Sequence, residues 1–309
     1  MEGGAVVVDI FKVETGYATV CKIDRQTYER ATGMKKRFRR KTRNGESLFA
    51  VCPACDNPIQ IIGLYRNTPE SGKKPYGRHF GQSIPDLAEY DEEAYWDCPF
   101  ADPSDHKPRP PRRIESRLSK QILETLYDQF DRVIYILAKD TDVSFSFALA
   151  RKMLEGYLAR EGWSFRDAAP YNLPWTFPEG QVALPLYGQR VKRDSEVFSA
   201  ISQHCKNVEW KETSARDMAI LQKKGEQYLD LNFAFVNHSK IVQDEHLNES
   251  IEFWVYQGSD PEKGTVYRKD ILIQSDYFMN LIALPPERSF RNEKLLELAH
   301  TMLEDYVKK

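Results

Sequence analysis

Four residues in the N-terminal third of the chain have the types and spacing of a metal site. Cys52 and Cys55 form a C-x2-C pair within FAVCPACDNPIQIIG, and His79 and Cys98 follow downstream. A tight turn at such a pair brings both sulfur atoms within about 2.3 Å of one zinc ion, and Pro53 stiffens this turn. We predict a closed Cys3His zinc site, which is structural because no coordination position remains for water or substrate.

Two alternatives remain for this cluster. His106 could replace His79 as the fourth ligand, or the cysteines could be ordinary buried residues beside a surface histidine. A redox role for the C-x2-C pair is disfavoured because no βαβ pattern surrounds it. The remaining cysteines, Cys21 and Cys205, are expected to be buried apolar residues.

The composition indicates a soluble, globular protein. The chain has 309 residues, of which 41% are hydrophobic and 29% are charged. No apolar run is long enough for a transmembrane helix, and the N-terminal apolar run is too short for a signal peptide. We therefore expect a cytoplasmic protein without a membrane partner. Five cysteines, an odd number, argue against a disulfide framework.

Charge is segregated along the chain although the net charge is only −2. The basic strip KKRFRRKTR consists of Phe38, Thr42 and the cations Lys35, Lys36, Arg37, Arg39, Arg40, Lys41 and Arg43. Such a run can follow a phosphate backbone, and the binding would depend strongly on salt. The alternatives are a solvated loop, or neutralisation by the acidic segment 86–97. Further cations could extend the surface: Lys73, Lys74, Arg78, Arg112, Arg113, Arg117 and Lys120.

The proline-rich stretch ADPSDHKPRPPRR, residues 101–113, predicts a domain boundary. We expect a β-rich, zinc-ribbon-like module over residues 1–105 and a mixed helix and sheet domain over residues 106–309, so the fold class is α+β. The second domain could be a diverged core of the restriction-endonuclease type.

Hydrophobic periodicity predicts the elements of the second domain. Helices are expected over 114–130, 146–163, 214–225 and 292–309, and strands over 132–138, 228–236, 250–257, 265–273 and 276–282. Ser214 and Asp217 occupy the N-cap and N3 positions of the third helix in this prediction.

The stretches FAVCPACDNPIQIIG, GRHFG and ESRLSKQIL resemble the N-terminal zinc-binding region of the bacterial competence-associated CoiA-like proteins, over about residues 45–130. The resemblance implies a prokaryotic or phage protein concerned with DNA uptake, DNA processing or defence. It also implies that a nuclease-like domain follows the zinc-binding region.

Nuclease chemistry of that class needs an Asp on one strand and Glu-x-Lys on the next, which hold Mg2+ near the scissile phosphate. Asp230 and Glu252 provide one trial pair, but Trp254 stands where the lysine is needed. Glu209 and Lys211 provide the Glu-x-Lys motif without a matching upstream acid. Both sets are incomplete, which favours a diverged and inactive nuclease-like domain, and Mg2+ is expected only if the chain is a nuclease.

These patterns support three hypotheses of function. The leading one is a zinc-binding protein that binds nucleic acid, or a nucleic-acid-handling complex, in DNA processing or anti-phage defence. The second is a metal-dependent nuclease. The third is an assembly or inhibitor subunit that binds protein and in which zinc is only a structural staple.

Overall fold

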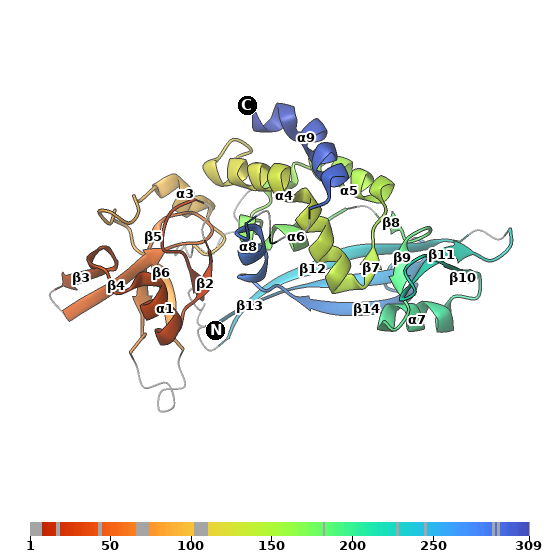
Figure 1. Cartoon of the computed structure of the whole chain (residues 1–309), viewed down its shortest axis with the longest axis horizontal. Coiled ribbons are helices and arrows are strands. Elements are labelled where there is room, and N and C mark those ends of the chain that lie inside the picture. Colours follow the sequence, from red (N-terminus) through yellow and green to blue (C-terminus); the bar gives the residue numbers. More distant parts are fainter. Residues whose placement is uncertain are drawn as a thin grey trace.

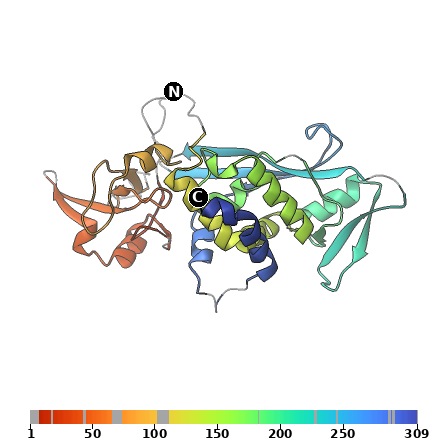
Figure 2. The ribbon, with the colours of Figure 1, turned by 90° about the horizontal axis from the view of Figure 1, so that it is seen from above.

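Helices and antiparallel sheets are mixed along the chain. The computed structural model describes residues 8–16, 19–42, 45–65, 74–101, 111–181, 183–226, 229–243, 246–285, 288 and 291–308. The N-terminal part lies at one end of the molecule, and the remaining helices and sheets extend away from it in both views (Figures 1 and 2). The predicted combination of helices and sheets is confirmed at this coarse level.

The N-terminal part is rich in short strands. In chain order it contains β1 (Ile10–Phe11), β2 (Cys21–Lys22), α1 (Arg25–Thr32), the 3-10 turn η1 (Lys36–Phe38), β3 (Arg39–Thr42), β4 (Gly45–Val51), β5 (Pro58–Ile62), β6 (Tyr76–His79) and α3 (Glu92–Asp97). Strands β3 to β6 form one antiparallel sheet in chain order, called the N-terminal sheet below.

Helix α1 is fixed to the N-terminal sheet by a buried tyrosine. The Asp24 side chain caps the helix by accepting a hydrogen bond from Thr27 N, and the helix ends at Gly33, whose φ of 54° favours glycine. Between these caps the Tyr28 hydroxyl donates to the carbonyl oxygen of Phe49 at 2.7 Å. A buried tyrosine with a hydrogen-bonded hydroxyl contributes apolar contact without leaving a polar group unpaired.

The rest of the chain holds the longer helices and two further sheets. Its elements are α4 (Arg117–Thr141), β7 (Val143–Ser144), α5 (Phe147–Ala159), η2 (Gly162–Ser164), η3 (Pro170–Asn172), α6 (Leu173–Thr176), β8 (Leu184–Pro185), β9 (Arg190–Lys192), α7 (Glu196–His204), β10 (Val208–Glu212), β11 (Met218–Lys223), β12 (Leu231–Gln243), β13 (His246–Gln257), β14 (Thr265–Leu272), α8 (Tyr277–Ile282) and α9 (Glu293–Val307).

The second part contains a central antiparallel sheet with strand order β14-β13-β12-β8. Ile251, Phe253 and Val255 alternate along β13 and are fully buried. Helices α4, α5 and α9 lie on one side of the sheet (Figure 1). These three residues therefore place one face of β13 in the core, and Trp254 and Tyr256 on the other face are also buried, at 7% and 3% exposed. The strand itself was predicted from the sequence over 250–257.

The remaining sheet, with strand order β10-β11-β9-β7, contradicts the helix predicted over 214–225. Residues 218–223 are instead strand β11, which pairs with β10 on one side and β9 on the other. Ala219 and Leu221 are fully buried, so the apolar residues follow a period of two rather than 3.6. The Ser214 and Asp217 capping pattern was misleading, since serine and aspartate also favour turns.

Helix α4 contradicts the strand predicted over 132–138. The helix continues to Thr141 past a kink at Gln129, whose φ of −131° and ψ of 16° are not helical. Ile136 and Leu137 are fully buried, and the tertiary packing of α4 overrides the strand preference of β-branched residues. The strand predicted over 276–282 is likewise helix α8. Among the described helices, none is both long and apolar enough to cross a membrane.

Candidate metal centre

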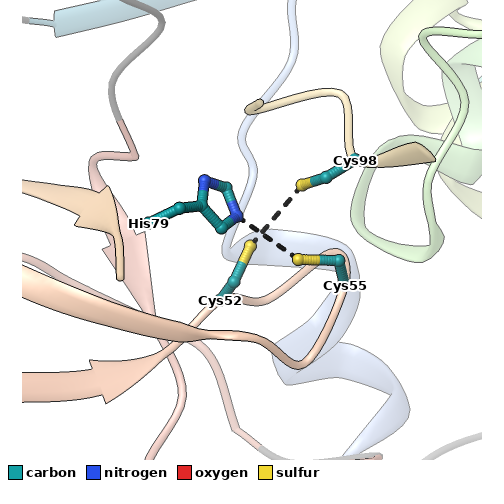
Figure 3. Close-up of side chains that lie close together, drawn as sticks. All are labelled: Cys52, Cys55, His79 and Cys98. Atoms are coloured by element: carbon teal, nitrogen blue, oxygen red, sulfur yellow. Dashed lines mark hydrogen bonds between the residues drawn. The ribbon is translucent and has the colours of Figure 1, made fainter. Parts of the chain in front are cut away.

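Three separate elements bring Cys52, Cys55, His79 and Cys98 together (Figure 3). The two cysteines of the C-x2-C pair lie in the turn between β4 and β5. His79 is the last residue of β6, and Cys98 is the C-cap of α3. Among the described residues, these four form the one group of three or more metal-ligating side chains that lie close enough together to share a metal ion.

The C-x2-C turn is closed by its own backbone. Cys52 N donates to the carbonyl oxygen of Asn57 at 2.8 Å, and Asp56 N donates to the carbonyl oxygen of Cys52 at 3.1 Å. Asp56 has a φ of 61°, a left-handed conformation that aspartate tolerates better than most residues. These contacts direct both cysteine side chains to the same side of the turn, as Figure 3 shows.

The distances fit a tetrahedral metal ion. The ligand atoms of the four side chains all lie within 4.8 Å of one another. Two sulfur atoms that bind one zinc ion tetrahedrally are separated by about 3.8 Å. The Sγ atoms of Cys52 and Cys98 are 3.8 Å apart, and Cys55 Sγ lies 3.3 Å from His79 Nε2. The four side chains could therefore bind a metal ion such as zinc.

Burial and hydrogen bonding among the three thiols shift their pKa values in different directions. Burial alone would raise the pKa of Cys52, but hydrogen bonds from the other two cysteines and from backbone amides hold this pKa well below its ordinary value. Burial and the neighbouring Cys52 raise the pKa of Cys55 and, more strongly, that of Cys98. Three thiolates this close repel one another, and a divalent cation is the species that would stabilise all three.

Asn57 connects the C-x2-C turn to the helix that carries Cys98. Its fully buried amide donates to Cys55 Sγ at 3.4 Å and to the carbonyl oxygen of Asp91 at 2.9 Å. In return Asp91 N donates to Asn57 Oδ1 at 2.7 Å. Asp91 is the N-cap of α3, so one side chain positions both a sulfur ligand and the helix that ends at Cys98.

Asp56 connects the same turn to α4. Its carboxylate, 3% exposed, forms an ion pair with the buried Lys12 and a second one with Arg117 at 3.1 Å. Gln121 Nε2 also donates to this carboxylate at 3.3 Å. Arg117 and Gln121 lie in the first turns of α4, so the candidate metal centre is joined directly to the second part of the molecule.

The basic strip begins in η1 and continues along β3, at the edge of the N-terminal sheet. Lys35, Lys36, Arg39 and Lys41 are exposed, whereas Phe38 is 1% exposed and belongs to the core. Arg39 pairs with Glu46 on the neighbouring strand at 3.2 Å. Arg43 lies outside the described residues.

The acidic segment pairs with other arginines rather than with the basic strip. Glu93 pairs with Arg113, and Asp91 approaches Arg117 at 3.8 Å. Asp97 pairs with Arg166 at 3.2 Å. Among the described residues, none of the ion pairs joins the acidic segment to the basic strip. The acids therefore hold α3 against the start of α4 and the turn that follows η2.

Of the cations proposed to extend the basic surface, Arg112 is not available. It is 3% exposed, and its guanidinium donates to backbone carbonyls at Asp97, Trp163, Arg166 and Ala168. Lys73 and the alternative ligand His106 lie outside the described residues. Arg78 is exposed and lies beside His79 on β6.

The trial nuclease residues do not converge. Asp230 precedes β12, and Glu252 on β13 pairs with Val236, six residues further along β12. Six residues of strand span about 20 Å, so the two carboxylates lie far apart. Glu252 instead accepts hydrogen bonds from Asn237 at 2.9 Å and from Trp254 at 2.6 Å. The structure thus gives no metal site built on this pair.

Glu209 and Lys211 lie on β10, the edge strand of its sheet, and both are exposed. Each is paired in the ladder with a residue of β11, Gln222 and Ile220 respectively. Within the described residues, no cluster of metal-ligating side chains includes either of them.

A buried polar network on the central sheet was not found from the sequence. Glu249, with a side chain 1% exposed, accepts hydrogen bonds from Tyr171 at 2.8 Å and from Asn172 at 2.6 Å. His238 Nε2 lies 2.8 Å from Glu249, and its Nδ1 lies 3.4 Å from Glu179. Burial opposes the charge of His238, but the two carboxylates outweigh it and raise its pKa to about 9. These residues are distant in sequence and form no motif, although the histidine occurs at a β-bulge of β12.

Comparisons with known proteins found no match for this chain among protein-family models, curated proteins or solved structures. The class that the architecture and the site define is a mixed helix and sheet protein with a Cys3His cluster whose three cysteines are buried.

Proposed function

We propose that this chain is a zinc-dependent nucleic-acid-binding protein, in which zinc holds the N-terminal part together as a zinc-ribbon-like module. The observation that carries the proposal is a Cys3His cluster with three buried cysteines that lies in the same N-terminal part as an exposed basic strip. A zinc site with four protein ligands has a structural role, because no position remains for substrate.

The charge distribution supports nucleic acid as the ligand. The exposed cations of the basic strip gather on one edge of the N-terminal sheet, while the acidic segment is occupied with Arg113, Arg117 and Arg166. A local cluster of lysine and arginine on a protein with a net charge of −2 is suited to contacts with phosphates.

The biological setting in this proposal follows from the sequence resemblance, which implies DNA processing or anti-phage defence in a prokaryote or phage. The nuclease hypothesis has weaker support, because Asp230 and Glu252 are separated along the β12–β13 hairpin. Binding through a nucleic-acid-handling complex remains part of the proposal, since the same basic strip would face the nucleic acid there.

Fluorescence anisotropy with labelled single-stranded and duplex oligonucleotides tests the proposal. Replacing Lys35, Lys36 and Arg40 by glutamine should weaken binding and lower the slope of log K against log salt by about 2 for a single strand, if all three contact phosphates. A matched control replaces the exposed Lys206, Lys223 and Lys224, which lie at the ends of α7 and β11, far from the N-terminal sheet in Figure 1, and should bind like the wild type. Absence of binding at low salt, or equal weakening in both variants, would overturn the proposal.

A further inference from the structure

The two faces of the N-terminal sheet differ in chemistry. Paired residues in an antiparallel sheet point to the same face, and successive residues alternate. The pairs Arg40 with Ser47 and Gln60 with Arg78 therefore lie on one face. Their neighbours Leu48 with Ile61, and Ile59 with His79, lie on the other.

The second of these faces is covered. Leu48, Ile59 and Ile61 are each at most 5% exposed. A Cβ added at Gly77 on this face would come within 2.8 Å of Ile59 Cδ1 and 3.3 Å of Ile23 Cδ1. The segment that precedes α1 therefore packs tightly on this side of the sheet, which leaves no room for a ligand.

The opposite side, called the open face below, carries polar and aromatic side chains. The strand register also puts Phe49 and Val51 on this side, but they are 2% and 0% exposed, and Phe80 packs against Phe49 with ring centroids 5.0 Å apart. The name therefore denotes only the accessible part of this side, which consists of Arg40, Ser47, Gln60, Ile62, Tyr76, Arg78 and Phe80, all of which are exposed or half-buried. Gln60 Nε2 donates to Ser47 Oγ at 3.1 Å, which confirms that their side chains share a side. Phe80 N donates to the carbonyl oxygen of Pro58 at 2.9 Å and so continues the ladder of β6.

The open face has an excess of positive charge. Its residues include two arginines and no acid, and among the described residues no carboxylate forms an ion pair with Arg40 or Arg78. Arg39, the adjacent cation of the basic strip, lies on the covered side, where it pairs with Glu46. The strip is therefore divided between two faces, and the open face is the one that also contains Arg78.

We propose that the open face binds single-stranded nucleic acid, with phosphates on Arg40 and Arg78 and bases on Tyr76 and Phe80. This inference rests on the proposed function and identifies the surface and the strand type. β3 and β6 are three strand spacings apart, or about 14 Å, so the strand would cross the sheet. Half-buried aromatic rings on a sheet can stack unpaired bases, whereas bases within a duplex are not accessible to them.

The test compares two adjacent arginines that point to opposite faces. Arg40→Gln and Arg78→Gln should each lower the salt-dependence slope for oligothymidylate or oligouridylate by about 0.7, while Arg39→Gln leaves it unchanged. Tyr76→Leu should weaken binding by at least about fivefold without changing the slope, because stacking does not depend on counterion release. Circular dichroism and zinc content of each variant establish that it is folded.

The outcomes separate this inference from the proposed function. If the wild type binds no nucleic acid, the proposed function itself fails. If the wild type binds but Arg39→Gln weakens binding as much as Arg40→Gln does and Arg78→Gln has no effect, only the open face is overturned. Tighter binding to a duplex than to either of its single strands would overturn the strand type. Parallel DNA and RNA oligonucleotides show which sugar is preferred.

Discussion

At the scale of single residues, the chemistry of the cluster depends on sulfur. Cys98 reaches the C-x2-C turn from a different element, and the distance of 3.8 Å between its Sγ and that of Cys52 matches the edge of a zinc tetrahedron. A serine hydroxyl at this position would be a far poorer zinc ligand than a thiolate, because zinc prefers sulfur and nitrogen ligands in closed sites.

We therefore expect Cys98→Ser to lose most of its bound zinc and to unfold at a lower temperature than the wild type. Binding energy at a structural zinc site is folding energy, so the two losses should occur together. Elemental analysis and differential scanning calorimetry measure them. Cys21→Ser is the matched control, because Cys21 is a free cysteine outside the cluster. Equal zinc content in the two variants would contradict a Cys3His site.

His238 gives a pH dependence at the same scale. Its pKa is about 6.5 in an unfolded chain and about 9 in the folded protein, so its contribution to stability is complete below pH 6.5 and is lost as the pH rises through 9. The free energy of unfolding should fall by on the order of 3 kcal/mol over this window. Chemical denaturation of the wild type and of His238→Gln measures the difference, and His204→Gln, at an exposed site, is the control. Parallel pH profiles for wild type and His238→Gln would contradict the interaction of a charged His238 with Glu249 and Glu179.

At the scale of elements, sequence patterns succeeded where a periodicity was long and unambiguous. The closing helix α9 and the strands β13 and β14 were expected within a few residues of their observed bounds. Residues 132–138 and 218–223 failed because a short apolar run is compatible with either period, and tertiary packing decides between them. Tyr135 is 54% exposed between the buried Ile134 and Ile136, so it lies on the solvent-facing side of helix α4, which the sequence alone did not reveal.

The candidate site shows the same division. Cys52, Cys55, His79 and Cys98 could be named from their types, because few other arrangements use a C-x2-C pair with a downstream Cys-Pro. Asp56 and Asn57 could not be assigned, although both lie beside the motif. Their importance comes from Lys12, Arg117 and α3, which only the fold brings close to them.

The ion pair between Asp56 and Lys12 leads to a prediction at this scale. Asp56→Asn preserves the shape of the turn but leaves the buried Lys12 without its carboxylate, which should cost about 3–5 kcal/mol. The double variant Asp56→Asn with Lys12→Met removes both charges and should recover much of this loss. Urea denaturation of the wild type, of Asp56→Asn, of Lys12→Met and of the double variant gives the coupling free energy between the two side chains. Additive effects would show that the pair has no specific role.

At the scale of the whole molecule, the N-terminal part is joined to the rest by buried polar contacts. The Arg112 guanidinium reaches carbonyls on both sides of the joint, at Asp97 before Cys98 and at Trp163, Arg166 and Ala168 after α5. Burial lowers the pKa of Arg112 to about 10, with Asp97 opposing this effect. An arginine can serve several carbonyls in this way because its guanidinium has five N–H donors.

Arg112→Met should therefore weaken the attachment of the N-terminal part to the rest of the chain while the metal centre stays intact. The carbonyls lose their donor, and the free energy of unfolding should fall by at least about 3 kcal/mol while zinc content stays at the wild-type level. If residues 1–105 and 106–309 form two domains, calorimetry of this variant should resolve two transitions, only one of which releases zinc. Arg113→Met is the matched control, because Arg113 follows Arg112 directly in the chain and its own side chain is 70% exposed. A single transition at the temperature of the control would mean that the two parts do not depend on Arg112 for their attachment.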